Sequence, residues 1–265
     1  MNGLELEPGL LVRLRAQADQ PPRVARLPLW AGDARIGSVE PDWARGVALR
    51  PECVERITCD GQEGWIVRGD ITASLGAIAF ALRDAGAAHA WRDEQLAVTD
   101  ESGTLLGTVE RAVVRPLGIA TRAVHLVGFS PDGRHWVQQR SLTKPNDPGR
   151  WDTLMGGMIP ACDSVDQALE RETWEEAGLR IAQLRELKHG GRVAMRCHTE
   201  SGRGGYVVEH IEWYRCVVPD GVVPQNQDGE VERFELLAPD EVAGRIARDA
   251  FTLEAALVLA ACAGL

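Results

Sequence analysis

The chain has 265 residues, of which 45% are hydrophobic and 26% are charged. These proportions are ordinary for a folded globular protein and exclude a largely disordered chain. The formal net charge of −10 argues against a broad nucleic-acid-binding face, because an acidic surface repels a polyanion. A small phosphorylated ligand remains compatible with this charge, since bound cations reverse the field around a site.

Cysteine spacing and hydropathy narrow the class of protein further. None of the six cysteines forms a Cys-x-x-Cys pair, so the usual zinc spacing is absent. The first residues, MNGLELEPGL, lack the basic and apolar regions of a signal peptide. The longest apolar run, residues 253–265, is too short to span a bilayer. We therefore expect a cytoplasmic protein with free thiols and neither a membrane nor a nucleic-acid partner.

The first part of the chain alternates between helix and strand patterns. Residues 4–18 favour a short helix or two, and residues 24–50 favour strands around turn signals. Residues 71–87 carry apolar side chains at helical spacing and end near Gly86, and residues 95–110 favour a β-hairpin. The character of the sequence changes after RPLG, so we place a domain boundary near residue 118. Residues 1–118 are expected to form a smaller α+β domain, and residues 119–265 a second domain.

The second part begins with strands expected at 123–129 and 135–140, joined by the turn SPDG. A polar loop, SLTKPNDPGRWD, precedes a glycine pair and a helix. Further strands are expected over residues 192–218 and in ERFELL, followed by a helix from Pro239 onward.

The helix after the glycine pair is the most informative segment. Ser164 and Gln167 form a capping-box pattern that predicts its start, and Gly178 predicts its end. At 3.6 residues per turn, one broad side of this helix carries apolar residues in its first turns and acidic residues in its later turns. The acidic positions are Glu172, Glu175 and Glu176. These carboxylates repel one another, and a hard divalent cation such as Mg²⁺ explains their clustering. The alternative is a solvated acidic face.

The whole segment reads G-x5-D-x7-R-E-x-x-E-E-x-G-L and resembles the Nudix box, G-x5-E-x7-R-E-U-x-E-E-x-G-U with U aliphatic. Asp163 stands where the box has glutamate, and Thr173 where it has its first aliphatic residue. The resemblance implies an α/β fold, namely an α/β/α sandwich with a mixed sheet over residues 119–265. It also implies a Mg²⁺ or Mn²⁺ cofactor and hydrolysis of a small-molecule diphosphate linkage, X–P–P–Y.

The same resemblance implies roles for individual residues. Glu175 and Glu176 would be metal ligands, and Glu172 a further ligand or the base that activates water. Arg171 would orient the carboxylates through charge-assisted hydrogen bonds. Gly157 would let its loop approach the metal closely.

Residues outside the box are further candidates. Glu230 is expected to supply a fourth carboxylate to the metal, the alternative being a surface acid. Lys144, Arg150 and Arg140 lie on or beside the loop before the glycines and suit diphosphate recognition. Trp151 is a candidate to stack on a substrate ring, with core packing as the alternative.

The motifs WRDE at 91–94 and ERA at 110–112, with Gly118 and His125, precede the box. This arrangement is similar to two-domain Nudix hydrolases related to the Nudix part of thiamin pyrophosphokinase fusions. It implies thiamin diphosphate, or damaged forms of it, as a substrate that is cut to the monophosphate. Residues 1–118 also carry several tryptophans that their own layer leaves uncovered. We therefore expect this domain to pack on the second and to shape the pocket mouth, since ligand sites favour domain interfaces.

Several alternatives stay open at this point. ADP-ribose and nucleotide sugars make the same demands on a site as thiamin diphosphate. A non-catalytic ligand-binding module and a prenyl diphosphate isomerase are compatible with the same fold. The sequence also leaves open whether the chain forms a homodimer.

Overall fold

A computed structural model describes residues 3–59, 61–88, 90–198 and 205–265. Its larger part is built on a seven-stranded sheet with the order β11-β12-β7-β8-β13, to which β10 and β9 add at β7 and β8. The strands are β7 (Thr121–Phe129), β8 (His135–Arg140), β9 (Trp151–Asp152), β10 (Met155–Met158), β11 (Arg185–His198), β12 (Tyr206–Val217) and β13 (Val231–Leu237). Strands β12 and β7 run parallel, whereas the other pairs are antiparallel, so the sheet is mixed.

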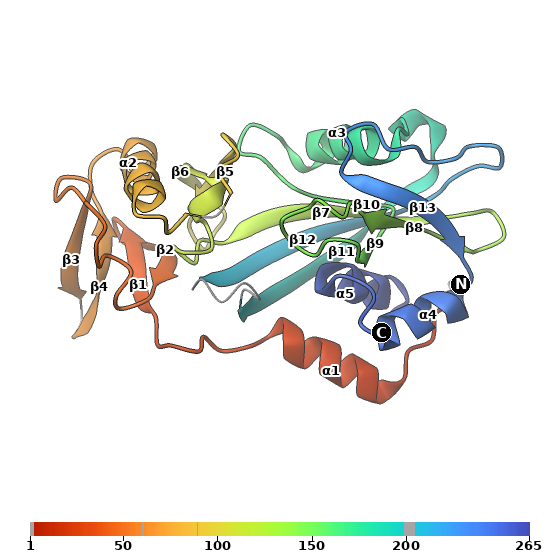
Figure 1. Ribbon diagram of the computed structural model, residues 1–265, viewed down its shortest axis with the longest axis horizontal. Helices are drawn as coiled ribbons and strands as arrows, with labels where there is room; N and C mark the ends of the chain where they lie inside the picture. Colours follow the sequence, from red (N-terminus) through yellow and green to blue (C-terminus); the bar gives the residue numbers. More distant parts are fainter. Residues whose placement is uncertain (1–2, 60, 89, 199–204) are drawn as a thin grey trace.

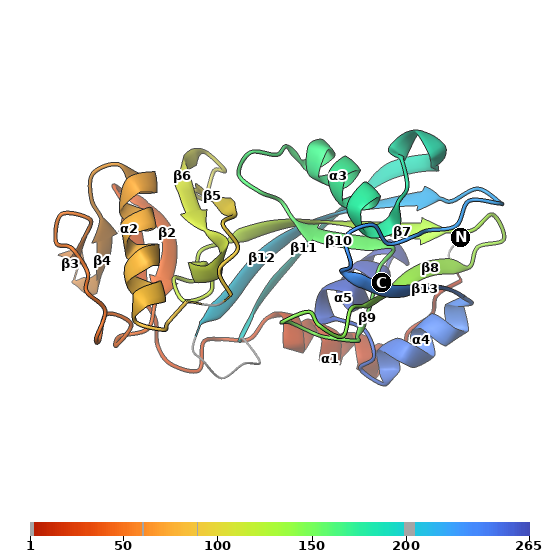
Figure 2. The same cartoon turned by 45° about the horizontal axis from the view of Figure 1, so that its top comes forward.

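Helices cover both faces of this sheet (Figures 1 and 2). Helix α3 (Val165–Ala177) lies on one face, and α1 (Pro8–Ala18), α4 (Pro239–Ala247) and α5 (Leu253–Cys262) lie on the other. Alternation along β7 supplies both cores, because successive side chains point to opposite faces. Val124 and Leu126 pack in the cluster under α3, whereas Ala123 and Val127 pack in the cluster with α5. The expected α/β/α sandwich is confirmed.

A smaller α+β unit precedes this sandwich along the chain. Strands β1 (Leu27–Ala31), β2 (Ala34–Val39), β3 (Val54–Cys59) and β4 (Gln62–Val67) form a sheet of order β2-β1-β4-β3. Helix α2 (Ile71–Asp84), the hairpin β5 (Gln95–Thr99) with β6 (Leu105–Glu110), and the 3-10 helix η1 (Arg111–Val113) complete it. Its own apolar cluster includes Leu29, Leu75, Val109 and Ile119. The expected helix and hairpin of this region are confirmed.

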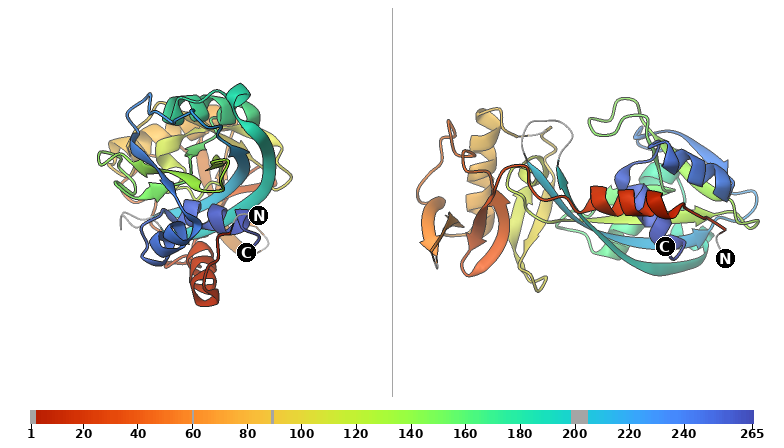
Figure 3. Two further views of the ribbon diagram at one scale, coloured as in Figure 1. Left: turned by 90° about the vertical axis from the view of Figure 1, so that its right-hand side faces the viewer. Right: turned by 90° about the horizontal axis from the view of Figure 1, so that it is seen from below.

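Helix α1 departs from the expected division at residue 118. Leu10 and Leu14 of this helix belong to the apolar cluster that also holds Val258 of α5 and Met195 of β11. The view from below in Figure 3 shows α1 beside the C-terminal helices, apart from the smaller sheet. The chain therefore crosses from the sandwich to the smaller unit between α1 and β1. The sequence of an amphipathic helix shows which face is apolar but not which element covers that face. For this reason the sequence alone groups α1 with the strands that follow it in the chain.

A second 3-10 helix, η2 (Ile181–Gln183), links α3 to β11. In the described ranges, no helix combines the length and hydropathy needed to cross a membrane.

Candidate active site

Helix α3 has the caps that its sequence predicts. The Ser164 hydroxyl accepts a bond from the Gln167 backbone N–H at 3.2 Å, and the Gln167 side chain accepts from the Ser164 N–H at 2.8 Å. Gly178 ends the helix in the left-handed conformation with φ of 63°. A Cβ atom at this position would lie 2.6 Å from the Gln225 carbonyl oxygen, so both backbone angle and space favour glycine.

Arg171 ties three carboxylates together at the start of the acidic turns. Its guanidinium lies 3.0 Å from Asp163, 3.0 Å from Glu172 and 2.8 Å from Glu175. Asp163 thus keeps a carboxylate in contact with this arginine. The geometry suits the orienting role that the sequence suggests for Arg171.

Glu172 is held against the glycine pair that precedes the helix. A Cβ atom at Gly157 would lie 2.4 Å from the Glu172 Cδ atom, so this carboxylate occupies the space that any side chain at Gly157 would need. Burial, followed by the negative charge of Glu176, raises the pKa of the Glu172 carboxyl to about 8, and Arg171 opposes this only in part. The loop at Gly157, which was expected to approach the metal closely, therefore lies close to the Glu172 carboxylate of α3.

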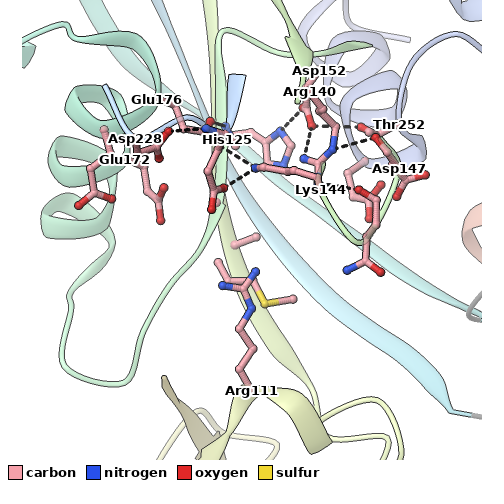
Figure 4. Close-up of a pocket in the computed structure, with 18 of the residues that line it drawn as sticks. Arg111, His125, Arg140, Lys144, Asp147, Asp152, Glu172, Glu176, Asp228 and Thr252 are labelled. Carbon is pink, nitrogen blue, oxygen red and sulfur yellow. Dashed lines mark hydrogen bonds and ion pairs between the residues drawn. The ribbon is translucent and has the colours of Figure 1, made fainter. Parts of the chain in front are cut away.

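Glu176 is the most deeply buried of the three acids, with 1% of its surface exposed. Its carboxylate accepts hydrogen bonds from Gln138 Nε2 at 2.8 Å and from the Gly156 N–H at 3.0 Å. Lys144 Nζ lies 3.4 Å from Glu176 and 2.5 Å from Glu230, and so bridges the two carboxylates. Figure 4 shows Lys144 extending toward Glu176. Burial would raise the pKa of Glu230, but the bond and charge of Lys144, and then the charges of Arg92 and Arg111, hold it below the usual value.

These side chains open on a cavity of about 320 Å³. Beneath it, His125 Nδ1 lies 3.0 Å from Thr153 Oγ1 and 3.6 Å from Asp152, and Arg140 lies 3.3 Å from Asp152. Burial lowers the pKa of His125, which keeps the ring neutral despite these acids. Residues that line or support the cavity and that sequence reasoning missed are Gln138, Asp152, Glu209, Asp228, Thr252 and Glu254. They come from separate strands, loops and helices, so no local pattern joins them.

The structure places two expected substrate-binding residues, Trp151 and Arg150, outside the acidic cavity. The Trp151 ring is 7% exposed and packs in the apolar core, with the Arg245 guanidinium 4.3 Å from its centroid. Arg150 donates to the Phe251 carbonyl at 3.1 Å and lines a neighbouring hollow of about 690 Å³. Stacking of Trp151 on a ligand in the acidic cavity is therefore wrong. On strand β9 the Asp152 side chain lines the cavity, which turns Trp151 to the opposite face.

The expected set of four metal ligands is not assembled. Across the described residues, no three His, Cys, Asp or Glu side chains converge as a metal site. Lys144 lies between Glu176 and Glu230, and Arg171 holds Glu175. Glu172 and Glu176 both line the cavity, and one or two carboxylates with waters and substrate phosphates are a usual Mg²⁺ environment. Glu172 and Glu176 are both buried acids that raise each other's cost in one cavity, and their oxygens are the donors that a hard divalent cation prefers, so this pair fits a cation.

Comparisons with known proteins agree with this arrangement. The model of the NUDIX domain family matches residues 120–260. Nudix hydrolase 24, chloroplastic, of Arabidopsis thaliana is 31% identical over 148 residues, which cover 54% of this chain and 40% of the plant protein. An isopentenyl-diphosphate Delta-isomerase of Streptomyces avermitilis is 30% identical over 158 residues, which cover 59% of this chain and 77% of the isomerase.

A solved structure, DR0079 from Deinococcus radiodurans, matches with a TM-score of 0.51 and 21% identity over 63% of this chain and 99% of that one. This likeness supports the fold. The chain spans about half the length of several curated relatives that it matches.

Proposed function

The chain belongs to the Nudix hydrolase family, and from this premise we propose that it hydrolyses a diphosphate linkage in a small molecule with the help of a divalent cation. The observation that carries the proposal is the crowding of Glu172 and Glu176 in one cavity beside the positive charges of Arg171 and Lys144. Repelling carboxylates that are buried together are costly in a site without a cation.

Different side chains of the site would bind the cation, orient the carboxylates and contact the substrate. Glu172 and Glu176 would hold Mg²⁺ or Mn²⁺, which neutralises charge on the phosphoryl oxygens when it is bound. Arg171 keeps Glu172 and Glu175 oriented toward the cavity, at 3.0 and 2.8 Å. Lys144 has an ammonium between two acids, from which it can turn to a phosphoryl oxygen of the substrate.

The proposed reaction consumes one water molecule. The water oxygen attacks one phosphorus, and the bond from that phosphorus to the bridging oxygen breaks. The water proton passes to Glu172 or Glu175, two of the three carboxylates that Arg171 holds. X–P–P–Y and water thus give the two monophosphates X–P and P–Y.

The substrate we propose first is thiamin diphosphate or a damaged form of it, with ADP-ribose and nucleotide sugars as the alternative. The acidic cavity of about 320 Å³ takes a diphosphate, and the neighbouring hollow of about 690 Å³ takes an organic body. The two share Arg115, Asn146, Asp147, Thr252 and Glu254 as lining residues. The match to an isopentenyl-diphosphate isomerase favours a second candidate, isomerisation of a prenyl diphosphate.

A substrate screen tests the proposal. The panel contains thiamin diphosphate, oxidised thiamin diphosphate, ADP-ribose, a nucleotide sugar and isopentenyl diphosphate, each with Mg²⁺ or Mn²⁺, and mass spectrometry identifies the products. We expect cation-dependent release of monophosphates, lost in Glu172→Gln and kept in Glu170→Gln. Glu170 is the matched control because it lies on the same helix with its side chain exposed.

Each other outcome points to a different function. Conversion of isopentenyl diphosphate to a product of the same mass, separated from it by chromatography before mass spectrometry, would favour the isomerase. Cation-dependent binding of a diphosphate without turnover would favour the non-catalytic module.

A further inference from the structure

A second charged wall faces helix α3 across the cavity, and it comes from the smaller α+β unit. Arg92, Arg111 and Arg115 line the same cavity as Glu172 and Glu176. We call these three residues the arginine wall. Figure 4 shows Arg111 extending from its 3-10 helix into the space below Lys144 and His125. These arginines belong to or adjoin the WRDE and ERA motifs, which the proposed chemistry leaves without a role.

Hydrogen bonds fix the arginine wall to the catalytic half of the cavity. The Ala161 N–H, in the loop of the Nudix motif, donates to the Gln95 carbonyl at 2.7 Å, and Leu96 bridges to Pro160. The Tyr206 N–H of β12 donates to the Arg115 carbonyl at 2.9 Å. Hairpin β5–β6 and the segment after η1 are thus both tied to the sandwich beside the site.

Within the arginine wall, acids of the two motifs set the positions of the basic groups. Glu110, only 2% exposed, accepts from the Arg92 backbone N–H at 3.0 Å. Glu94 accepts from the Arg111 guanidinium at 2.7 Å. The two motifs therefore hold a basic surface in a defined place.

Part of the positive charge of the arginine wall is not balanced by an ion pair in the described ranges. Among the residues that the structure describes, no carboxylate lies within ion-pair distance of the Arg92 or Arg115 guanidinium. Within the described part of the chain, the Arg115 guanidinium makes one hydrogen bond, a 3.4 Å contact with the Asn146 Oδ1 atom. Glu94 neutralises Arg111, so Arg92 and Arg115 are the guanidinium groups of the arginine wall that have no ion-pair partner in the described ranges.

We propose that the arginine wall binds the terminal phosphoryl group of the substrate, so that the enzyme prefers compounds with a free diphosphate end. This inference rests on the proposed hydrolase function. Guanidinium groups bind phosphoryl oxygens in pairs of parallel hydrogen bonds. A terminal phosphoryl group carries up to two negative charges and three free oxygens, whereas a phosphoryl group esterified at its far side carries one charge and two free oxygens. Two guanidinium groups without an ion-pair partner suit the terminal group, which offers them the extra charge and the extra free oxygen.

Binding of methylenediphosphonate tests the subsite without any turnover, because its P–C–P linkage cannot be hydrolysed. Calorimetry in Mg²⁺ buffer on the full chain compares wild type with Arg92→Gln, Arg111→Gln and Arg115→Gln. Each substitution should weaken binding roughly tenfold, the usual loss for one charge-assisted hydrogen bond. Arg92→Gln and Arg115→Gln are the most informative, since neither breaks an ion pair among the described residues, whereas Arg111→Gln also breaks the pair with Glu94.

The matched control is Arg45→Gln, an arginine of the same unit whose side chain is 80% exposed and lies outside the cavity. Its binding should equal that of wild type. Unchanged binding in all three cavity variants, or no binding by wild type at millimolar concentrations, would overturn the subsite.

A second measurement separates the subsite from the proposed function. The ratio of kcat/KM for thiamin diphosphate to that for ADP-ribose should fall roughly tenfold in Arg92→Gln, and an unchanged ratio would contradict the preference for a free end. If no diphosphate is hydrolysed but the arginine variants still lose methylenediphosphonate binding, the subsite stands and the hydrolase proposal fails.

Discussion

The two walls of the cavity are built in opposite ways. The acidic wall comes from one contiguous segment, residues 157–179, and its central carboxylate, Glu176, is 1% exposed. The arginine wall is spread over residues 92–115, and the Arg111 side chain is 36% exposed. The proposed reaction therefore depends on the acidic wall of the sandwich, whereas the preference for a free diphosphate end depends on the arginine wall of the smaller unit. The buried wall fixes the geometry of the reaction, and the more exposed wall presents its charge to the incoming substrate.

The largest expected effect is on the acidic wall. Glu176→Gln keeps the shape of the side chain but removes a charge from the proposed cation site. We expect kcat at saturating Mg²⁺ to fall on the order of 10³-fold, as when charge stabilisation of a transition state is lost. The melting temperature without metal should hardly change, because burying a carboxylate is itself unfavourable. Turnover near that of wild type would remove Glu176 from the reaction.

The next effect is a loss of stability at low pH, which limits the pH range in which variants of the two walls can be compared as folded proteins. Burial lowers the pKa of His135 from 6.5 to about 4, so the folded chain keeps this ring neutral. The unfolded chain binds a proton in this range, so His135 contributes its full stability above pH 6.5 and loses it as the pH falls to about 4. The loss amounts to roughly 3 kcal/mol.

Denaturant unfolding between pH 4 and 7 measures this loss. The difference between wild type and His135→Gln isolates the histidine from carboxylates that titrate in the same range. If the difference in free energy of unfolding between the two proteins did not vary with pH, His135 would not be buried as a neutral ring.

A smaller effect is expected at the contact between the glycine pair and the helix. Gly157→Ala would place a Cβ 2.4 Å from the Glu172 Cδ atom, so the carboxylate must move. We expect kcat/KM to fall about 10- to 100-fold, in keeping with displacement of a reacting group by about 1 Å. Gly76→Ala is the control, because its Cβ would meet nothing within 4 Å in helix α2. The control should keep activity and gain about 0.5–1 kcal/mol of stability. Equal activities of the two variants would show that the contact with Glu172 is dispensable.

The smallest effect is expected at Glu230, on the rim between the walls. Its side chain is 46% exposed and lies 2.5 Å from Lys144. Glu230→Gln should lower kcat by about three- to fivefold and raise KM by less. The effect is small because a half-exposed ion pair is worth under about 1 kcal/mol. Glu232→Gln, an exposed neighbour on β13, is the reference variant. Kinetics equal to those of Glu232→Gln would make Glu230 a surface acid.

Sequence predicted the acidic wall well because its determinants are local. The capping box at Ser164, the left-handed Gly178 and the spacing of the three glutamates all lie within one helix and its ends. Lys144 was also expected near the phosphates, and it lies between two of the acids.

The rest could not be predicted, because it depends on contacts between distant segments. Gln138 and Asp152 reach the cavity from β8 and β9, and nothing in the spacing of these residues marks them. Trp151 and Asp152 are adjacent in sequence, but strand geometry sends them to opposite faces. The WRDE and ERA motifs could be noticed without showing which cavity they face, since this depends on the bond between Ala161 and Gln95.

The proposed hydrolysis requires that water attacks a diphosphate held against the acidic wall. Turnover of thiamin diphosphate in ¹⁸O-labelled water with Mg²⁺, read by mass spectrometry, shows where the oxygen of water goes. We expect one ¹⁸O atom in only one of the two products, thiamin monophosphate or inorganic phosphate, and no products in Glu172→Gln. The same test on the best substrate of the screen extends it to the other diphosphates. Unlabelled products, or labelled products formed equally well by Glu172→Gln, would contradict it.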